Sequence, residues 1–320
     1  MLSEFRSHCL SAAFIGGRPS FALADGTVRR LGADEDCIRV HADASLAAAP
    51  VADEDALLTS GEDGRVCRTE ASGPSREVGA VPRKWITAIG QRKGRLAYAS
   101  GKTVWLQSAL GARELAHRRS VKGIAFAADG ARLAVAQQDC VTVHDTDTAG
   151  EPLELASNDI HNASTFSPDG RFLLVASQNS FLHGWRLSDR KHFRMLGYSG
   201  RVESWAWSSD GAHLATSGAS AAIVWPFDGN DGPMSRNAVE VAPRPQSAVT
   251  AVAWRPDARL LAIGYADGVV QLASAEDPPS VRPLREGGRA AITSIAWNRS
   301  GASVAFGSAA GECGVVAVDA

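Results

Sequence analysis

Short apolar runs separated by tight turns follow one another along the whole chain. Typical runs are "VTAVAW" at 249–254 and "ITSIAW" at 292–297, in which β-branched and aromatic residues dominate. Each run enters a turn of Pro, Asp, Gly or Ser, and a second run and a second turn follow. The second turn often holds Asp-Gly, as at 25–26, 63–64 and 267–268, because Gly tolerates positive φ in a hairpin. The pattern predicts β-strands throughout, and no apolar period of helical length interrupts it.

The stretch "FSPDGRFLLVAS" at 166–177 is the clearest copy of a unit that recurs along the chain. In each copy a third strand follows the second turn. A fourth strand, which is more polar and more variable, then leads to the next copy. A unit of this kind cannot bury both of its faces alone, so it needs neighbouring copies stacked against it. The equivalent turn positions lie about 40 residues apart, at Gly17, Asp55, Gly94, Gly130, Gly170, Gly211, Ala258 and Gly301.

This repeat predicts an all-β fold, a β-propeller in which each copy is one four-stranded antiparallel blade. We expect eight blades in a single domain over 1–320, with seven as the alternative because the two N-terminal copies are the weakest. The last copy holds only three strands, so we expect residues 2–5 to supply its fourth strand. The expected blades span about 8–40, 41–80, 81–117, 118–157, 158–198, 199–245, 246–287, and 288–320 plus 1–7.

The copies from Val121 onward resemble the WD40 repeat family, whose motif has the form V-x-x-V-A-F-S-P-D-G-x-x-L-A-S-G-S-x-D-G-x-V-x-x-W. The resemblance covers the whole chain, but no copy contains the Trp-Asp or Gly-His pair of the family. Gly200-Arg201 is the nearest equivalent of Gly-His. The resemblance therefore implies that the family's buried His–Asp hydrogen-bond tetrad is absent or partial. We expect Trp105, Trp185 and Trp225 to pack between sheets instead.

Composition narrows the class of protein further. The formal net charge of −2 gives no general attraction to nucleic acid or to an anionic membrane. Five scattered cysteines without a CxxC pair do not suggest disulfides or a zinc knuckle. The N-terminal segment has charged residues where a signal peptide is apolar, and no apolar run reaches membrane-spanning length. These features predict a cytoplasmic protein. Arginine outnumbers lysine and alanine is abundant, which is typical of bacterial proteins. We also expect a monomer.

Sequence motifs of catalysis are missing. The chain has no G-x-S-x-G nucleophile motif, and "GKT" at 101–103 lacks the first glycine of a P-loop. Its eight histidines are scattered, without HxxxH or HxH spacing. We therefore expect no catalytic residues, no cofactor and no metal site.

The remaining candidate site is the narrow face of the propeller. In WD40 proteins the residues that flank the start of each first strand often contact a partner. At the matching positions this chain carries Trp85, Lys122, Asn162, Arg201 and Glu203. Tryptophan and arginine are the residue types most enriched in binding hot spots. A structural role is the competing interpretation for Trp85, and a surface ion pair is the competing interpretation for Arg201 with Glu203.

The sequence thus predicts a non-enzymatic scaffold that binds a partner protein or peptide on this face. The alternative is a small-molecule-binding or metal-binding propeller, or an enzyme, that uses the central channel. Propellers of that kind place His, Asp or Glu at their strand starts, whereas Thr, Ala, Ser and Asn are more frequent here. Nucleic-acid binding ranks third, because no basic stripe is visible.

Overall fold

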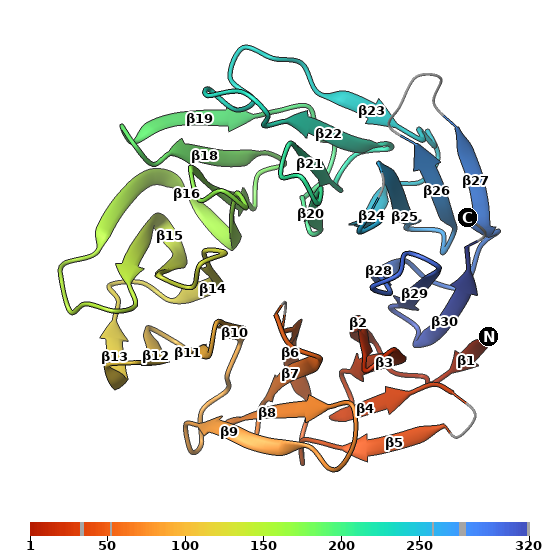
Figure 1. The fold of residues 1–320 in the computed structure, drawn as a ribbon, viewed down its shortest axis with the longest axis horizontal. Coiled ribbons are helices and arrows are strands. Elements are labelled where there is room, and N and C mark those ends of the chain that lie inside the picture. Colours follow the sequence, from red (N-terminus) through yellow and green to blue (C-terminus); the bar gives the residue numbers. More distant parts are fainter. Residues whose placement is uncertain (33–34, 52, 258, 275–279, 319–320) are drawn as a thin grey trace. The chain divides into compact units, whose positions relative to one another are not determined.

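The structure is a computed structural model that describes residues 1–318 except 33–34, 52, 258 and 275–279. The described residues form β-strands joined by turns (Figure 1). They contain no helix long and apolar enough to cross a membrane. The predicted turn position Ala258 lies outside the described residues.

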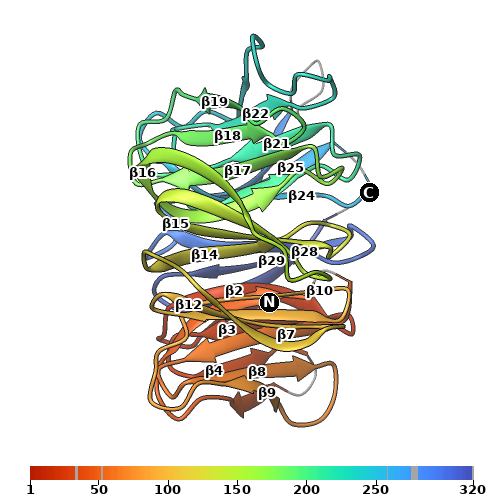
Figure 2. The same ribbon diagram turned by 90° about the vertical axis from the view of Figure 1, so that its left-hand side faces the viewer.

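All pairings recorded between neighbouring strands are antiparallel. Four-stranded sheets follow one another along the chain, as the repeat predicted, and this is the architecture of a β-propeller. Figure 2 shows strands of one sheet running side by side, for example β7, β8 and β9. The first three sheets contain β2 (Cys9–Ile15), β3 (Arg18–Leu23), β4 (Thr27–Arg30), β5 (Asp36–Arg39); β6 (Ser45–Pro50), β7 (Ala56–Gly61), β8 (Arg65–Glu70), β9 (Arg76–Ala80); and β10 (Ala88–Arg92), β11 (Arg95–Ser100), β12 (Thr103–Ser108), β13 (Gly111–Ala116).

The next sheet has six strands, and three further four-stranded sheets complete the fold. The six-stranded sheet contains β14 (Val121–Phe126), β15 (Arg132–Asp145), β16 (Leu153–Phe166), β17 (Phe172–Ser177), β18 (Leu182–Arg186) and β19 (Lys191–Met195). The last three contain β20 (Trp205–Trp207), β21 (His213–Thr216), β22 (Ala222–Pro226), β23 (Val239–Val241); β24 (Val249–Trp254), β25 (Leu260–Tyr265), β26 (Val270–Ser274), β27 (Val281–Arg285); and β28 (Ile292–Trp297), β29 (Ser303–Ser308), β30 (Glu312–Ala317), β1 (Leu2–Glu4).

The expected count of eight separate blades is wrong, because the hydrogen bonds define seven sheets. The seven-bladed alternative has the right count, but not for the predicted reason, since both N-terminal copies form complete sheets. The copies at 118–157 and 158–198 instead share the six-stranded sheet. Gln138 in β15 pairs with Ile160 in β16, so the ladder runs from one copy into the next. The chain bends within β15 at Asp139, whose φ is +70°.

Turns of the "SPDG" type have the geometry that their residues predict. The carboxylates of Asp129, Asp169 and Asp210 each accept a hydrogen bond from the backbone N–H two residues later, at 2.9, 3.0 and 2.9 Å. The glycine between has positive φ in each case, between 69° and 77°. These are the side-chain-to-backbone bonds and left-handed residues that favour Asp-Gly in turns.

The N-terminal strand completes the last sheet, as predicted. Leu2, Ser3 and Glu4 of β1 pair with Gly314, Cys313 and Glu312 of β30. The Val315 N–H also donates to the Met1 carbonyl at 2.9 Å, and the Phe5 N–H donates to the Gly311 carbonyl at 2.9 Å. The edge of β30 is therefore covered by the other end of the chain.

The described chain divides into two compact units. Unit 1 contains 1–24, 29–36 and 196–320, and unit 2 contains 25–28 and 37–195. Within each unit the apolar core lies between successive sheets. In unit 1, one cluster joins β21 and β22 to β24 and β25 through residues such as Val224 and Leu261. In unit 2, another joins β7 to β10 and β11 through Leu58 and Ile89.

The three predicted tryptophans pack as follows. Trp185 is 2% exposed and belongs to the cluster of β15 and β17. Trp105 is half-buried, stacks on Tyr98 and donates its indole N–H to Glu114 at 2.9 Å. Trp225 is 9% exposed and donates its indole N–H to the Tyr198 hydroxyl at 2.8 Å.

Candidate functional site

A β-bulge lies near the start of most first strands. The pairing register shifts by one residue in β2, β6, β14, β16, β24 and β28. A bulge leaves one residue outside the ladder and turns its side chain in a new direction, a device common beside binding sites. The bulge residues are Leu10, Leu46, Lys122, Asn162, Thr250 and Thr293.

Two predicted site residues, Lys122 and Asn162, are therefore bulge residues. Their strands β14 and β16 are close neighbours in unit 2 (Figure 1). A Cβ on Gly123 would lie only 2.8 Å from the Ala163 Cα and 2.9 Å from the Asn162 carbonyl oxygen. Because the two backbones approach so closely, the structure brings Lys122 and Asn162 to the same place.

Trp85 is a third predicted residue of unit 2. It lies before β10, and its side chain is 59% exposed. The next residue, Ile86, is fully buried, and the Ile86 N–H donates to the Gly61 carbonyl at 3.3 Å. The structure therefore anchors the neighbouring backbone and leaves the Trp85 indole at the surface, which removes the interpretation of Trp85 as a core residue.

Arg201 and Glu203 belong to unit 1 and lie just before β20. Both side chains are exposed, and the described residues include no ion pair between them. The backbone N–H groups of Glu203 and Ser204 both donate to the Ser217 hydroxyl, at 3.1 and 3.0 Å. At this strand start the buried Ser217 hydroxyl accepts backbone N–H groups that would otherwise pair with a carbonyl of the neighbouring strand. It thereby holds the backbone that carries Glu203.

A recess of about 560 Å³ opens in unit 2 between the loop before β14, the bend of β15 and the first half of β16. Its walls carry both positively and negatively charged side chains, as well as neutral hydrogen-bonding groups. Arg119 pairs with Asp139 at 3.6 Å, and both are exposed, so this pair is weak. The recess is lined by residues that include His117, Arg118, Arg119, Gln137, Asp139, Cys140, Thr142, His144, Glu154 and Asn158.

Two histidines at the recess are neutral at physiological pH. Burial lowers the pKa of His117 to about 4, and burial, reinforced by His117 and Arg113, lowers the pKa of His144 to about 4. Their rings meet edge to face with centroids 5.3 Å apart. The Nε2 atoms of both are buried and have no hydrogen-bond partner within the described part of the chain.

Cys140 in the same recess stays a thiol at neutral pH. Burial raises its pKa to about 11, and the neighbouring carboxylates Glu154 and Asp139 act in the same direction. A thiol in this state is a poor nucleophile and a poor metal ligand. The described residues also contain no group of three His, Cys, Asp or Glu side chains arranged to hold a metal ion.

Sequence reasoning did not identify His41, His117 or Tyr198 as equivalents of the family's Gly-His histidine. His41 and His117 lie four residues before Ser45 and Val121, the first residues of β6 and β14, and Tyr198 lies seven residues before Trp205, the first residue of β20. His41 is fully buried; its Nδ1 lies 3.0 Å from the Asp63 carboxylate and its Nε2 lies 2.9 Å from the Thr59 hydroxyl. The expected partial tetrad is therefore present in the β6–β9 sheet.

The sheet of β20–β23 uses tyrosine instead. The Tyr198 hydroxyl lies 2.8 Å from the Thr216 hydroxyl and accepts the Trp225 indole N–H. Gly197-Tyr198 supplies the buried hydroxyl of this sheet, three residues before Gly200-Arg201, the pair predicted as the nearest equivalent of Gly-His. The four-residue spacing was an available signal for His41 and His117, whereas Tyr198 has neither that spacing nor the histidine.

Comparisons with known proteins agree with this description. Residues 224–288 match the family model described as the WD40 domain of anaphase-promoting complex subunit 4. No curated protein sequence matches the chain. The computationally designed Ika8 protein is similar in structure, with a TM-score of 0.78, 17% identity, and coverage of 99% of this chain and 98% of the other. A chain of the mitotic checkpoint complex has a TM-score of 0.67 and 14% identity, with coverage of 83% and 88%. The structural neighbours thus show the fold of a β-propeller, and residues 224–288 are similar to a WD40 domain.

Proposed function

We propose that this protein is a non-catalytic, monomeric interaction module that binds a partner protein or peptide at the strand starts of unit 2. The WD40 propeller is a fold commonly used for protein interaction, and one structural neighbour is part of a multiprotein complex. The observation that carries the proposal is the 59% exposed Trp85 indole. A large apolar side chain held at the surface on an anchored backbone is a typical interface anchor.

The charges on this surface favour an acidic partner. Lys122 and Arg118 are exposed and form no ion pair within the described ranges, and Arg119 has only its weak pair with Asp139. Arg118 and Arg119 line the 560 Å³ recess, and Lys122 follows them at the bulge of β14. An acidic segment with an apolar side chain would satisfy the cations and cover the indole together. Arg201 and Glu203 would provide a separate contact in unit 1.

The proposal is tested by capture of partners from native cell extract. Tagged wild-type protein, Trp85→Ala and Lys122→Glu are compared by quantitative mass spectrometry. Leu110→Ala is the matched control, because Leu110 is a 56% exposed apolar residue of the same unit. We expect a protein that wild type and the control capture equally and both site variants lose. Equal recovery by all four proteins would place binding elsewhere.

A small-molecule or metal site is the second candidate function, and the unpartnered Nε2 atoms of His117 and His144 favour it. Neutral imidazoles facing a recess can accept or donate hydrogen bonds to a small polar ligand. Metal analysis and native mass spectrometry of protein purified without an affinity tag test it. A stoichiometric metal or bound molecule that His144→Ala abolishes would favour this candidate over the scaffold.

A further inference from the structure

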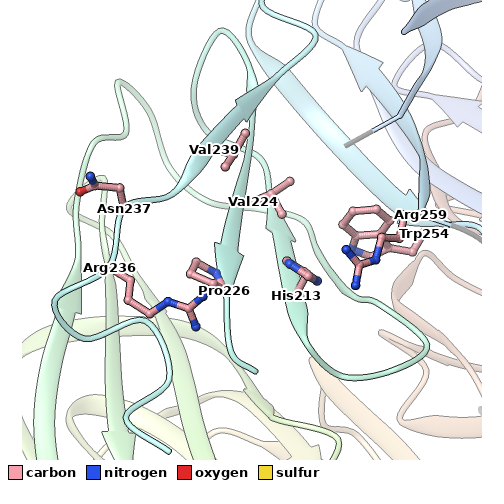
Figure 3. A pocket seen from close by; sticks show the side chains of 8 residues that line it. All are labelled: His213, Val224, Pro226, Arg236, Asn237, Val239, Trp254 and Arg259. Carbon is pink, nitrogen blue, oxygen red and sulfur yellow. The ribbon is translucent and has the colours of Figure 1, made fainter. Parts of the chain in front are cut away.

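A second pocket, of about 440 Å³, lies in unit 1 at the opposite ends of the strands from Arg201 and Glu203. It forms where β21 begins, β22 ends and β24 ends (Figure 3). The segment before β23 supplies its outer wall, within the long linker at 227–247. A volume of this size is in the range of small-molecule sites.

One wall of the pocket is apolar and rigid. Val224 and Trp254 are 3% and 8% exposed, and both belong to the core cluster of the two neighbouring sheets. The Trp254 indole N–H donates to the Ala206 carbonyl at 3.1 Å, which fixes the ring. Val239, by contrast, is 56% exposed in the edge strand β23. The pocket therefore offers a preformed apolar surface with an open side.

The polar lining residues are His213, Arg236, Asn237 and Arg259, and each of them can donate a hydrogen bond. His213 lies in the middle, and Arg236 and Arg259 extend toward it from opposite sides (Figure 3). No carboxylate side chain is among the described residues that line the pocket. Asp210 and Asp228 lie outside the lining but close enough to act electrostatically on His213.

The two arginines differ in how their acidic neighbours hold them. Arg259 and Asp210 are 3.7 Å apart, beyond hydrogen-bond distance, and their side chains are 55% and 48% exposed. Arg236 donates a hydrogen bond to the Asp228 carboxylate, in a pair that is 40% and 54% exposed. Exposed pairs of this kind contribute little to stability, so Arg259 is available to a ligand and Arg236 would offer its remaining N–H groups.

The protonation of His213 would respond to an anion bound in the pocket. Burial and the nearby Arg259 guanidinium lower the pKa of His213, and Arg236 acts in the same direction, while Asp210 and Asp228 oppose them. The imidazole is therefore neutral at neutral pH, and an anion bound between the arginines would favour its protonated form.

We propose that this pocket binds a carboxylate attached to an apolar body. The carboxylate would lie between Arg236 and Arg259 beside His213, because the guanidinium fork matches a carboxylate in geometry. The apolar body would lie on Trp254 and Val224. Two sources have this chemistry, a small organic acid and the C-terminus of a peptide that ends in an apolar residue.

Calorimetric titration of the full chain tests the proposal with matched probe pairs. The first pair is 4-phenylbutyrate and its neutral amide, and the second is N-acetyl-Gly-Phe with a free carboxylate and with an amidated end. We expect one site per chain and about tenfold or greater loss of affinity on amidation, as for a charge-assisted hydrogen bond. Tighter binding of the peptide acid would indicate a peptide terminus as the source, and tighter binding of phenylbutyrate a small acid.

Variants locate the site. Arg259→Gln and Arg236→Gln are each expected to weaken the acid about tenfold, whereas Arg282→Gln, an exposed residue of β27, leaves the affinity unchanged. In an NMR titration, the imidazole resonances of His213 should shift on binding and titrate at higher pH. Absence of binding, equal binding of acid and amide, or wild-type affinity in both pocket variants would overturn the proposal.

Discussion

Buried side chains that precede the first strands stabilise individual sheets through different hydrogen-bonding groups. His41 is held by Asp63 and Thr59, while Tyr198 is held by Thr216 and Trp225. Both are buried, so each polar atom needs its partner. Burial raises the pKa of Tyr198 to about 12, and the phenol therefore stays neutral and serves as donor and acceptor. Both sheets therefore contain a buried hydrogen-bond network, but the residue at its centre is histidine in one sheet and tyrosine in the other.

Tyr198→Phe tests that network. The substitution leaves the Thr216 hydroxyl and the Trp225 indole N–H buried with a partner lost, so we expect the free energy of unfolding to fall by about 1–3 kcal/mol. Urea unfolding measures it. Tyr98→Phe is the control, because Tyr98 is 5% exposed and its hydroxyl has no hydrogen bond among the described residues. Equal effects of the two substitutions would contradict the role assigned to Tyr198.

Buried neutral histidines predict acid sensitivity. His117, His144 and His183 have pKa values lowered to about 4, chiefly by burial, whereas an unfolded histidine titrates near 6.5. Between these values the unfolded state binds more protons, so their stabilising contribution is present above about pH 6.5 and is lost as the pH falls toward 4.

We therefore expect a lower urea midpoint at pH 5 than at pH 7. His144→Asn should reduce this pH dependence, because it removes one of the groups that must charge on unfolding. A midpoint that is independent of pH in the wild type, or an unchanged dependence in the variant, would contradict the assignment of these histidines as buried and neutral.

At the scale of strands, close approach of first strands positions the bulge residues. Gly123 in β14 faces the backbone of β16, whereas Gly90 in β10 has only the Phe126 ring within 4 Å, at 3.7 Å. Neither glycine has positive φ, so any effect of alanine arises from contact with the neighbour and not from backbone strain. Comparing alanine substitutions at Gly123 and Gly90 therefore distinguishes the effect of packing between strands from the effect of local backbone conformation.

Gly123→Ala is expected to lower the free energy of unfolding by about 1–3 kcal/mol, as overpacking does. Gly90→Ala should have a much smaller effect, since its Cβ would lie at an ordinary contact distance. Thermal and urea unfolding of both variants measure the difference. If Gly123→Ala were as stable as Gly90→Ala, β14 and β16 would not be as close as described.

The N-terminal strand is the second feature at this scale. Deletion of residues 1–8 removes β1 and exposes the edge of β30, so we expect the melting temperature to fall by several degrees. Replacement of Leu2, Ser3 and Glu4 by alanine keeps the backbone pairing and should have a smaller effect. An unchanged melting temperature in the deletion variant would show that β1 does not stabilise the last sheet.

For the whole molecule, sequence periodicity was sufficient to predict the fold but not the number of sheets. Turn residues such as Asp169 and Gly170 form hydrogen bonds and backbone conformations within a few residues of themselves, so the sequence alone is enough to predict hairpins from them. The merged sheet depends on Gln138 pairing with Ile160, a contact between copies that neither residue signals. The predicted Lys122 and Asn162 proved to be bulge residues because matched strand starts share one geometry. The two pockets depend on residues from several strands, and no local pattern indicates them.

The central claim is that Trp85, Lys122 and Arg118 of unit 2 form a protein-binding surface. The most direct test is the affinity of the purified captured partner for the wild-type protein, Trp85→Ala and Leu110→Ala, measured at two salt concentrations. We expect Trp85→Ala to weaken binding at least about tenfold, as loss of a hot-spot side chain does. Leu110→Ala should bind like the wild type, and added salt should weaken binding by the wild type. Wild-type affinity in Trp85→Ala, with no effect of salt, would contradict the account.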